Sequence, residues 1–254
     1  MNILVLVKAV PNTTGGMDSE DKKKTELIPN PADMTALEEA IILREQVGGT
    51  VTVATMGVES TVSILRQCIA RGADQAVLVT DSAFAGSDTN ATARILAKTV
   101  AHLGGFDLIF CGRKSTDGET GQVGPELAAH LGCNFVANCT AKTLEGNRIT
   151  CLCVTDRGTE TLACNLPAVV SFRNGINSPR LPSLSGLFKA NRKEIPKINR
   201  ETLGLPRELC GQAGSPTMVK KTYRRPFAKR RPQHLTDPEE IFQALQAGKE
   251  ASHG

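Results

Sequence analysis

The chain has 254 residues, of which 40% are hydrophobic and 22% charged, with a formal net charge of +4 at pH 7. These proportions are ordinary for a globular protein with one sizeable core. No apolar run approaches the roughly 18 residues of a transmembrane helix, and the N-terminal MNILVLVKAVPN reaches Lys8 and Pro11 too early for a signal peptide. We therefore expect a cytoplasmic protein that does not act in a membrane.

Apolar strands alternate with helical patterns through the first half of the chain. Strands are expected at residues 2–10, 50–56, 75–81 and 107–112, and helices at residues 33–49, 59–73, 88–105 and 124–132. Strands that are apolar throughout and are each followed by a helix indicate a parallel sheet covered on both faces. The sequence thus predicts an α/β fold with an open doubly wound, mostly parallel, Rossmann-like sheet of the adenine-nucleotide-binding kind.

The pattern changes after residue 133. The turns EGN (145–147) and DRGT (156–159) join short strands in hairpins, which predicts an antiparallel edge on the sheet. Residues 190–235 are rich in proline and poor in apolar side chains, so they cannot form a core of their own. An amphipathic helix is expected over DPEEIFQALQAG (237–248). We predict a nucleotide-binding domain over residues 1–190 and an arm over residues 191–254 that wraps a partner.

The basic segment near the C-terminus and the cysteines indicate less about function than the strand and helix pattern does. The segment from Lys220 to Arg231 carries seven basic and no acidic residues, which suits either a nucleic-acid arm or a solvated or partner-docking arm. The rest of the chain has no nucleic-acid-binding signature, so the second interpretation is favoured. The eight cysteines contain no C-x-x-C pair, and most lie in apolar runs, as buried reduced thiols do. No metal site is predicted.

The strand–loop–helix stretch CGRKSTDGETGQVGPELAAHLG, residues 111–132, is the main candidate site. Its glycines allow close approach of a ligand, and a helix start offers free amides to an anion, although an ordinary glycine-rich connection has the same features. The dinucleotide fingerprint and the P-loop are both absent. The turn PNPAD, residues 29–33, is a second contact or simply a helix cap. No nucleophile–base arrangement is evident, so any catalysis would depend on a cofactor.

Several motifs together resemble the β subunit of electron transfer flavoproteins along nearly the full length. They are ILVLVKAVP, NPADMTALEEAIILRE, MGVES…ARGADQAVLVTD, ETLACNLPAVVS, which fits E-x-(L/I/V)-x4-P-x-V-V-(S/T), and NSPRLPSLSGLFKA. The resemblance implies a heterodimer with an FAD-carrying α subunit. The alternative is a stress-type adenine-nucleotide-binding protein of the same open-sheet fold. The long tail of this chain after residue 190 argues against that alternative.

The family contains two groups, and the resemblance implies which one fits. In one group the β subunit holds a structural AMP and docks acyl-CoA dehydrogenases. In the other it holds a second FAD, which takes electrons from NADH and divides them between ferredoxin and a partner flavoprotein dehydrogenase acting on an acyl-CoA, an enoyl-CoA or a 2-hydroxy acid. GRKSTDGETGQVGPE resembles the bifurcating pattern G-(R/K)-Q-x-x-D-G-(D/E)-T-x-Q-V-G-P-E. It departs from that pattern at Lys114 and Ser115.

The resemblance also implies individual residue roles. Leu184 corresponds to an exposed leucine in the loop that recognises the dehydrogenase, although a buried leucine at a helix start is the competing interpretation. We expect no catalytic residue and no metal ligand. The expected nucleotide contacts are Leu6, Lys8, Asn30, Asp33, Met56, Gly57, Gly112, Arg113, Ser115, Thr116, Asp117, Gly118, Glu119, Thr120, Gly121, Gln122, Val123, Gly124 and Pro125.

Overall fold

The structure is a computed structural model that describes residues 1–12, 26–221 and 235–250. The chain divides into two compact units, Met1–Met218 and Val219–Gly254. Among the described helices, none combines the length and apolar character needed to cross a membrane.

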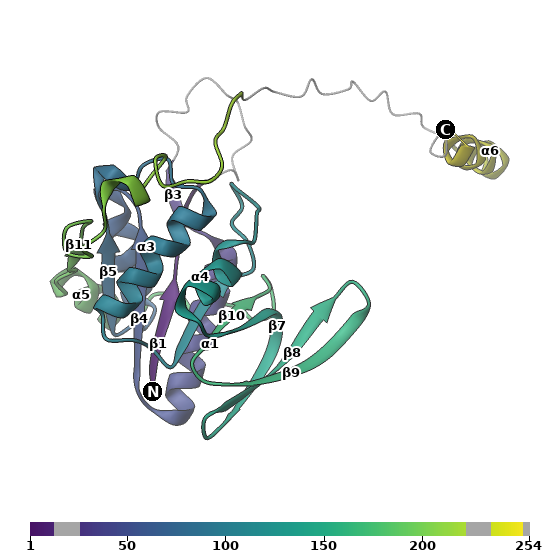
Figure 1. Cartoon of the computed structure of the whole chain (residues 1–254). Helices are drawn as coiled ribbons and strands as arrows, with labels where there is room; N and C mark the ends of the chain where they lie inside the picture. Colours follow the sequence, from purple (N-terminus) through teal and green to yellow (C-terminus); the bar gives the residue numbers. More distant parts are fainter. Residues whose placement is uncertain (13–25, 222–234, 251–254) are drawn as a thin grey trace. The chain divides into compact units, whose positions relative to one another are not determined.

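The first unit is built on one nine-stranded sheet (Figure 1). The strand order is β11-β5-β4-β1-β6-β10-β7-β8-β9, and every pair from β11 to β7 is parallel. The parallel strands are β1 (Asn2–Leu6), β4 (Thr50–Met56), β5 (Gln75–Val79), β6 (Leu108–Gly112), β7 (Asn134–Glu145), β10 (Ala168–Phe172) and β11 (Lys197–Ile198). The predicted open α/β sheet is confirmed.

Helices cover both faces of this sheet because its strands are apolar on both sides. The helices are α1 (Pro31–Val47), α2 (Val62–Ala70), α3 (Thr89–His102) and α4 (Val123–Leu131). Residues of α1 and α2 pack with Ile3, Val5 and Phe110 in one apolar cluster. Residues of α3 and α4 pack with Leu4 and Ile109 in another. Neighbouring residues of one strand thus belong to different clusters, because successive side chains of a strand point to opposite faces and both faces are buried here.

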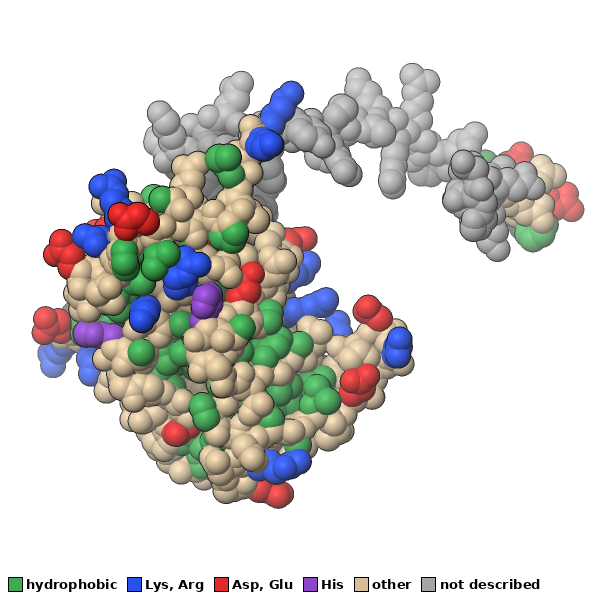
Figure 2. Space-filling model, viewed as in Figure 1, with side chains coloured by type: hydrophobic (Ala, Val, Ile, Leu, Met, Phe, Trp, Pro, Cys, Tyr) green, Lys and Arg blue, Asp and Glu red, His purple; other side chains and the backbone are tan. Residues whose placement is uncertain are grey.

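The antiparallel edge is also present. Strands β8 (Arg148–Thr155) and β9 (Gly158–Asn165) continue the sheet beyond β7 through two hairpins. On the face seen in Figure 2, hydrophobic side chains gather between α4 and these strands. The sequence alone did not show that β10 pairs with both β6 and β7, which places the strand AVVSF inside the parallel sheet.

The first strand is shorter than the pattern predicts. Residues 2–10 are apolar apart from Asn2 and Lys8, but β1 ends at Leu6, and β2 (Ala9–Pro11) pairs antiparallel with β3 (Leu27–Pro29) in a separate sheet. The cause lies at Lys8, whose backbone N–H donates to the Asp33 carboxylate and whose carbonyl accepts from the Asn30 N–H. These bonds turn the chain away from the main sheet.

The chain after β10 packs largely against the same unit. Helix α5 (Leu184–Arg192) lies on α2, and β11 pairs with β5. Ile198, Leu203, Leu205 and Cys210 join Val77 and Val79 in a third apolar cluster. The proline-rich segment up to Met218 therefore has a covering surface within its own chain.

The second unit contains α6 (Pro238–Glu250), in agreement with the predicted closing helix. Its Ile241, Phe242 and Leu245 are exposed at a spacing that puts them on one side of the helix. The basic segment from Lys220 to Arg231 lies outside the described residues, apart from Lys220 and Lys221.

Ile198→Ala tests whether the segment around β11 belongs to the folded domain. Ile198 is buried, so its truncation should lower the free energy of unfolding by about 2–4 kcal/mol. Met218→Ala, at a residue that is 66% exposed, is the control and should change it by less than about 0.5 kcal/mol. Urea unfolding of both variants checks this. Equal midpoints would show that the segment adds nothing to stability.

Candidate functional site

The order of strands reverses between β1 and β6. From β1 the chain proceeds to β4 and β5 on one side, then crosses to β6 on the other. In open parallel sheets, ligands bind at the carboxyl ends of the strands at such a switch point. Here the loop after β1 carries Lys8, and the loop after β6 begins at Arg113. The sequence-predicted site residues therefore meet at the position that the topology favours.

Asn30 joins helix α1 to the loop after β6. It occupies the N-cap position, and Pro31 begins the helix as proline often does, but the Asn30 side chain makes no capping hydrogen bond. Instead its amide donates to the carbonyl of Lys114 at 3.2 Å, and its carbonyl oxygen accepts from the N–H of Thr116 at 3.2 Å. The capping interpretation is therefore wrong for Asn30, whose buried side chain fixes the loop.

Asp33 is a buried carboxylate at the centre of the site. Its Oδ2 accepts from the Lys8 N–H at 2.8 Å and its Oδ1 from the Gly112 N–H at 2.9 Å. Burial raises the pKa of Asp33 from 3.8 to about 6, against the opposing effects of these amides, the Asn30 side chain and the Lys8 charge. Asp33 thus ties α1 to the ends of β1 and β6.

The loop after β6 is held by its own polar contacts. The Lys8 ammonium pairs with Asp117 at 2.8 Å and donates to the Ser115 hydroxyl at 3.4 Å. Burial alone would raise the pKa of Asp117, but its hydrogen bonds with Lys8 and Ser115 and the charge of Lys8 hold that pKa below its ordinary value. Lys114 pairs with Glu119 at 3.3 Å. Glu119 has a φ of 54°, a left-handed conformation that is uncommon outside glycine.

A cavity of about 210 Å³ opens between this loop, the start of α1 and the end of β10. Three cationic side chains, Arg113, Lys114 and Arg173, face one anionic side chain, Glu119, around it. The whole lining consists of Asn30, Pro31, Ala32, Arg113, Lys114, Ser115, Thr116, Glu119, Arg173 and Asn174. Excess positive charge together with hydroxyl and amide donors suits a phosphate-bearing ligand.

The remaining predicted contacts lie around the cavity but do not line it. Leu6 is buried in the sheet, Met56 is the last residue of the neighbouring strand β4, and Gly57 follows it. Gln122 and Glu126, at the start of α4, accept hydrogen bonds from the Thr89 hydroxyl of α3. The others outside the lining are Lys8, Asp33, Gly112, Asp117, Gly118, Thr120, Gly121, Gln122, Val123, Gly124 and Pro125.

Arg173 and Asn174 are the cavity-lining residues that lie outside every segment singled out from the sequence. They follow β10, and β10 lies beside β6 with its carboxyl end at the same edge. The signal was present in the sequence: an apolar strand, AVVSF, is followed directly by polar RN, as β6 is followed by polar RKST. Pro31 and Ala32, at the start of α1, were passed over between Asn30 and Asp33.

The structure places Leu184 at the first position of α5, where the residue is 72% exposed. The competing interpretation of a buried helix-start leucine is therefore wrong. Leu181 and Phe188 are exposed nearby, at 83% and 60%. Leu184 and Phe188 lie one turn apart on α5, and exposed apolar side chains grouped in this way are typical of an interaction site.

An open parallel α/β domain with a cationic cavity at its switch point is the architecture of nucleotide-binding α/β proteins. Comparison with known proteins narrows this class. A family described as "Electron transfer flavoprotein domain" matches residues 21–203. The chain belongs to the electron transfer flavoprotein family, and the relatives below are similar to it over most of their length.

The electron transfer flavoprotein subunit beta of Thermoanaerobacterium thermosaccharolyticum is 41% identical, and the match covers 87% of each chain. Protein FixA of Sinorhizobium fredii is 36% identical, over 88% of this chain and 83% of FixA. The caffeyl-CoA reductase–Etf complex subunit CarD of Acetobacterium woodii is 35% identical, over 89% and 88%. The resemblance read from the motifs is confirmed.

Gly112→Ala should disrupt the site. A Cβ at Gly112 would lie 2.5 Å from Asp33 Oδ1 and 2.6 Å from Ala32 Cβ, so α1 would have to move away from β6. We expect a loss of about 1–3 kcal/mol in the free energy of unfolding. Gly118→Ala is the matched control, because its Cβ would meet only ordinary contacts at 3.5 and 3.8 Å. Thermal unfolding of both variants measures the difference, and equal stability would contradict the close packing.

Asp33→Asn should change the pH dependence of stability. The folded-state pKa lies above the ordinary 3.8, so the folded protein binds this proton more tightly than the unfolded chain. The associated stability is present below pH 4 and is lost as the pH rises through about 6. Asparagine does not titrate and so has no such pH-dependent contribution. The substitution should therefore lower the free energy of unfolding by about 1–3 kcal/mol at pH 5 and by less at pH 7.5. Urea unfolding at both pH values tests this; a pH-independent difference would contradict it.

Proposed function

We propose that this chain is the β subunit of a bifurcating electron transfer flavoprotein in the cytoplasm. It would pair with an FAD-carrying α subunit, hold an FAD of its own at the cavity, and accept electrons from NADH. One electron would pass to ferredoxin and the other to a partner flavoprotein dehydrogenase, acting on an acyl-CoA, an enoyl-CoA or a 2-hydroxy acid. The proposal rests on the cationic cavity at the switch point together with the family membership.

The cavity chemistry supports a nucleotide. Arg113 and Arg173 come from loops after adjacent strands, so their guanidinium groups can meet one anion from two sides. Arginine forks match phosphate oxygens in geometry as well as charge. A cavity of about 210 Å³ is smaller than the roughly 300 Å³ or more of most ligand pockets. We infer that it takes the phosphate end of the nucleotide, and that the remainder extends beyond it.

The choice of FAD over AMP rests on the loop sequence and on one relative. GRKSTDGETGQVGPE resembles the bifurcating pattern, and CarD is named as a subunit of a caffeyl-CoA reductase–Etf complex. Gly118 does not line the cavity but lies next to Ser115 and Lys8 in the same loop. Because glycine has no side chain, this part of the loop leaves room for a ligand larger than AMP. The alternative is a non-bifurcating β subunit in which AMP occupies the same cavity and the chain docks acyl-CoA dehydrogenases.

A bound flavin would supply the hydride and single-electron chemistry. The residues of this chain have other tasks. Arg113, Lys114 and Arg173 would bind and neutralise phosphate charge, and Asn30 would hold the loop that carries two of them. Asp33, being bonded to two backbone amides, would keep the strand ends and α1 in register. No side chain is needed as acid or base.

Two surfaces fit the α subunit. Apart from Glu145 and Arg148 beside the β7–β8 turn, one face of β7–β9 carries uncharged side chains at its paired positions, which are Ala141, Thr143, Thr150, Leu152, Val154, Thr159, Thr161, Ala163 and Asn165. The second is the apolar side of α6 in the C-terminal unit. We propose that the arm over residues 191–254 wraps the α subunit through α6. The exposed apolar side chains around Leu184 would dock the dehydrogenase.

Counting nucleotides tests the function. The chain is co-expressed with its α subunit, and the denatured heterodimer is analysed for FAD and AMP by chromatography. Two FAD and no AMP per heterodimer are expected; one FAD and one AMP would favour the alternative, and one FAD with no AMP would contradict both.

Arg173→Ala should weaken retention of the β-subunit nucleotide about tenfold or more, because a charged hydrogen-bond donor is lost. Arg157→Ala, in the β8–β9 turn, should leave retention unchanged.

A further inference from the structure

The segment between β10 and the end of α5 joins two regions of different function. It begins with Arg173 and Asn174 in the cavity lining and ends with α5. Between these ends it exposes Leu181, Leu184 and Phe188. These exposed side chains gain nothing from burial in their own chain, so polar contacts elsewhere in the segment contribute to holding it in place.

Arg180 supplies the main contact at the start of this segment. Its Nε donates to both Glu38 oxygens at 3.0 and 3.1 Å, and its NH2 donates to Glu38 Oε1 at 2.9 Å. Its NH1 donates to Glu45 at 2.6 Å, and its backbone N–H donates to Glu38 at 2.9 Å. Glu38 is buried, and both glutamates belong to α1. A single side chain thus bridges two turns of α1.

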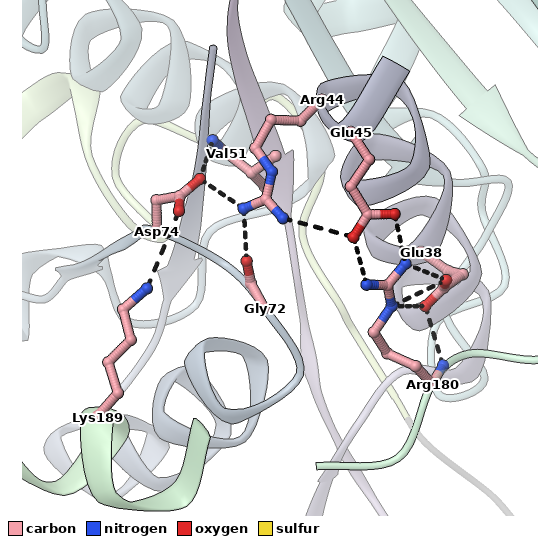
Figure 3. A network of polar contacts seen from close by, with 8 residues as sticks. All are labelled: Glu38, Arg44, Glu45, Val51, Gly72, Asp74, Arg180 and Lys189. Carbon is pink, nitrogen blue, oxygen red and sulfur yellow. Dashed lines mark hydrogen bonds and ion pairs between the residues drawn. The ribbon is translucent and has the colours of Figure 1, made fainter. Parts of the chain in front are cut away.

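The contacts continue to the other end of the segment (Figure 3). Glu45 also pairs with Arg44 at 3.8 Å, and Arg44 pairs with Asp74 at 2.8 Å. Asp74 in turn lies 3.9 Å from the ammonium of Lys189 on α5. One continuous polar network therefore holds Arg180 and Lys189, which flank the exposed leucines on both sides.

Close packing at Gly186 sets the distance between α5 and α2. A Cβ at Gly186 would lie 2.2 Å from the carbonyl oxygen of Ala70, so only glycine allows this approach. Ser183 caps the helix by accepting from the Gly186 N–H at 2.9 Å, and its own N–H donates to Ala70. The Arg66 guanidinium donates to the Ala190 carbonyl. These contacts fix α5 from Ser183 onward on α2, and Arg180 anchors the residues that lead into the helix.

We propose that Arg180 is a positioning residue for dehydrogenase docking, because its fork to Glu38 anchors the beginning of the segment Leu181–Phe188 to helix α1. The docking role of this segment rests on the proposed function. The Arg180 side chain does not line the cavity, and its hydrogen-bond partners are the two α1 glutamates. Lysine cannot replace it fully, because an ammonium lacks the planar fork that spans both oxygens of a carboxylate.

Hydrogen exchange of the heterodimer tests the brace without any partner. In Arg180→Gln, amides in peptides covering residues 181–190 should exchange about tenfold or more faster, as expected for the loss of several charge-assisted bonds. Glu38→Gln should act in the same direction, and Arg180→Lys should lie between. Arg157→Gln is the matched control and should leave these peptides unchanged. Unchanged exchange in Arg180→Gln would overturn the proposal.

A kinetic measurement separates positioning from general destabilisation. The electron donor is an acyl-CoA dehydrogenase kept reduced by its acyl-CoA, and the heterodimer is the varied acceptor. Arg180→Gln should raise KM about tenfold with kcat and nucleotide content unchanged, and Arg180→Lys should restore part of the loss. A fall in kcat or Tm with unaltered KM would overturn the positioning role.

Leu184→Ala distinguishes this proposal from the proposed function. It should raise KM for the dehydrogenase while leaving the exchange of residues 181–190 unchanged, because Leu184 makes a docking contact and no bracing contact. If the wild-type heterodimer accepts no electrons from the dehydrogenase, or Leu184→Ala does not alter KM, the docking function fails. Hydrogen exchange in Arg180→Gln still decides whether Arg180 braces the segment.

Discussion

The site depends above all on the two hydrogen bonds that the Asp33 carboxylate accepts. They join the first turn of α1 to the amide after β1 and to the last amide of β6. These are the two strands between which the chain reverses direction across the sheet. A buried carboxylate is costly unless its oxygens are satisfied, and here two backbone donors satisfy them. The same bonds end β1 early, turn Lys8 toward the loop after β6, and keep the cavity between α1 and that loop open.

Much of the fold could be read from the sequence because the strands are buried on both faces. Continuous apolar runs such as TVTVATM and QAVLV have few other possible environments, and the helices between them have clear boundaries. The position of β10 could not be read in this way. Whether AVVSF pairs with a sequence neighbour or with β6 is decided by tertiary packing, and local pattern carries no information about it.

The site was predictable to the extent that its residues lie next to one strand. The loop from Gly112 onward carried its own signal, and Asn30 and Asp33 followed from the same family resemblance. Arg173 and Asn174 required knowledge of the strand order. The role of Asn30 also depended on tertiary contacts: its backbone occupies a helix-capping position, yet its side chain bonds to Lys114 and Thr116, which are distant in sequence.

The pairing of β11 with β5 has a consequence for solubility. Strand β5 reads QAVLV, and without a neighbour on its outer side it would present a row of free amides and carbonyls on a hydrophobic strand. Such an edge is a template for strand addition by a second molecule. The two residues of β11, preceded by Pro196 and beginning with Lys197, occupy this edge with the short, charged and proline-flanked strand that resists further pairing. A chain ending before Glu194 would therefore tend to associate edge to edge, even though its remaining helices and strands were intact.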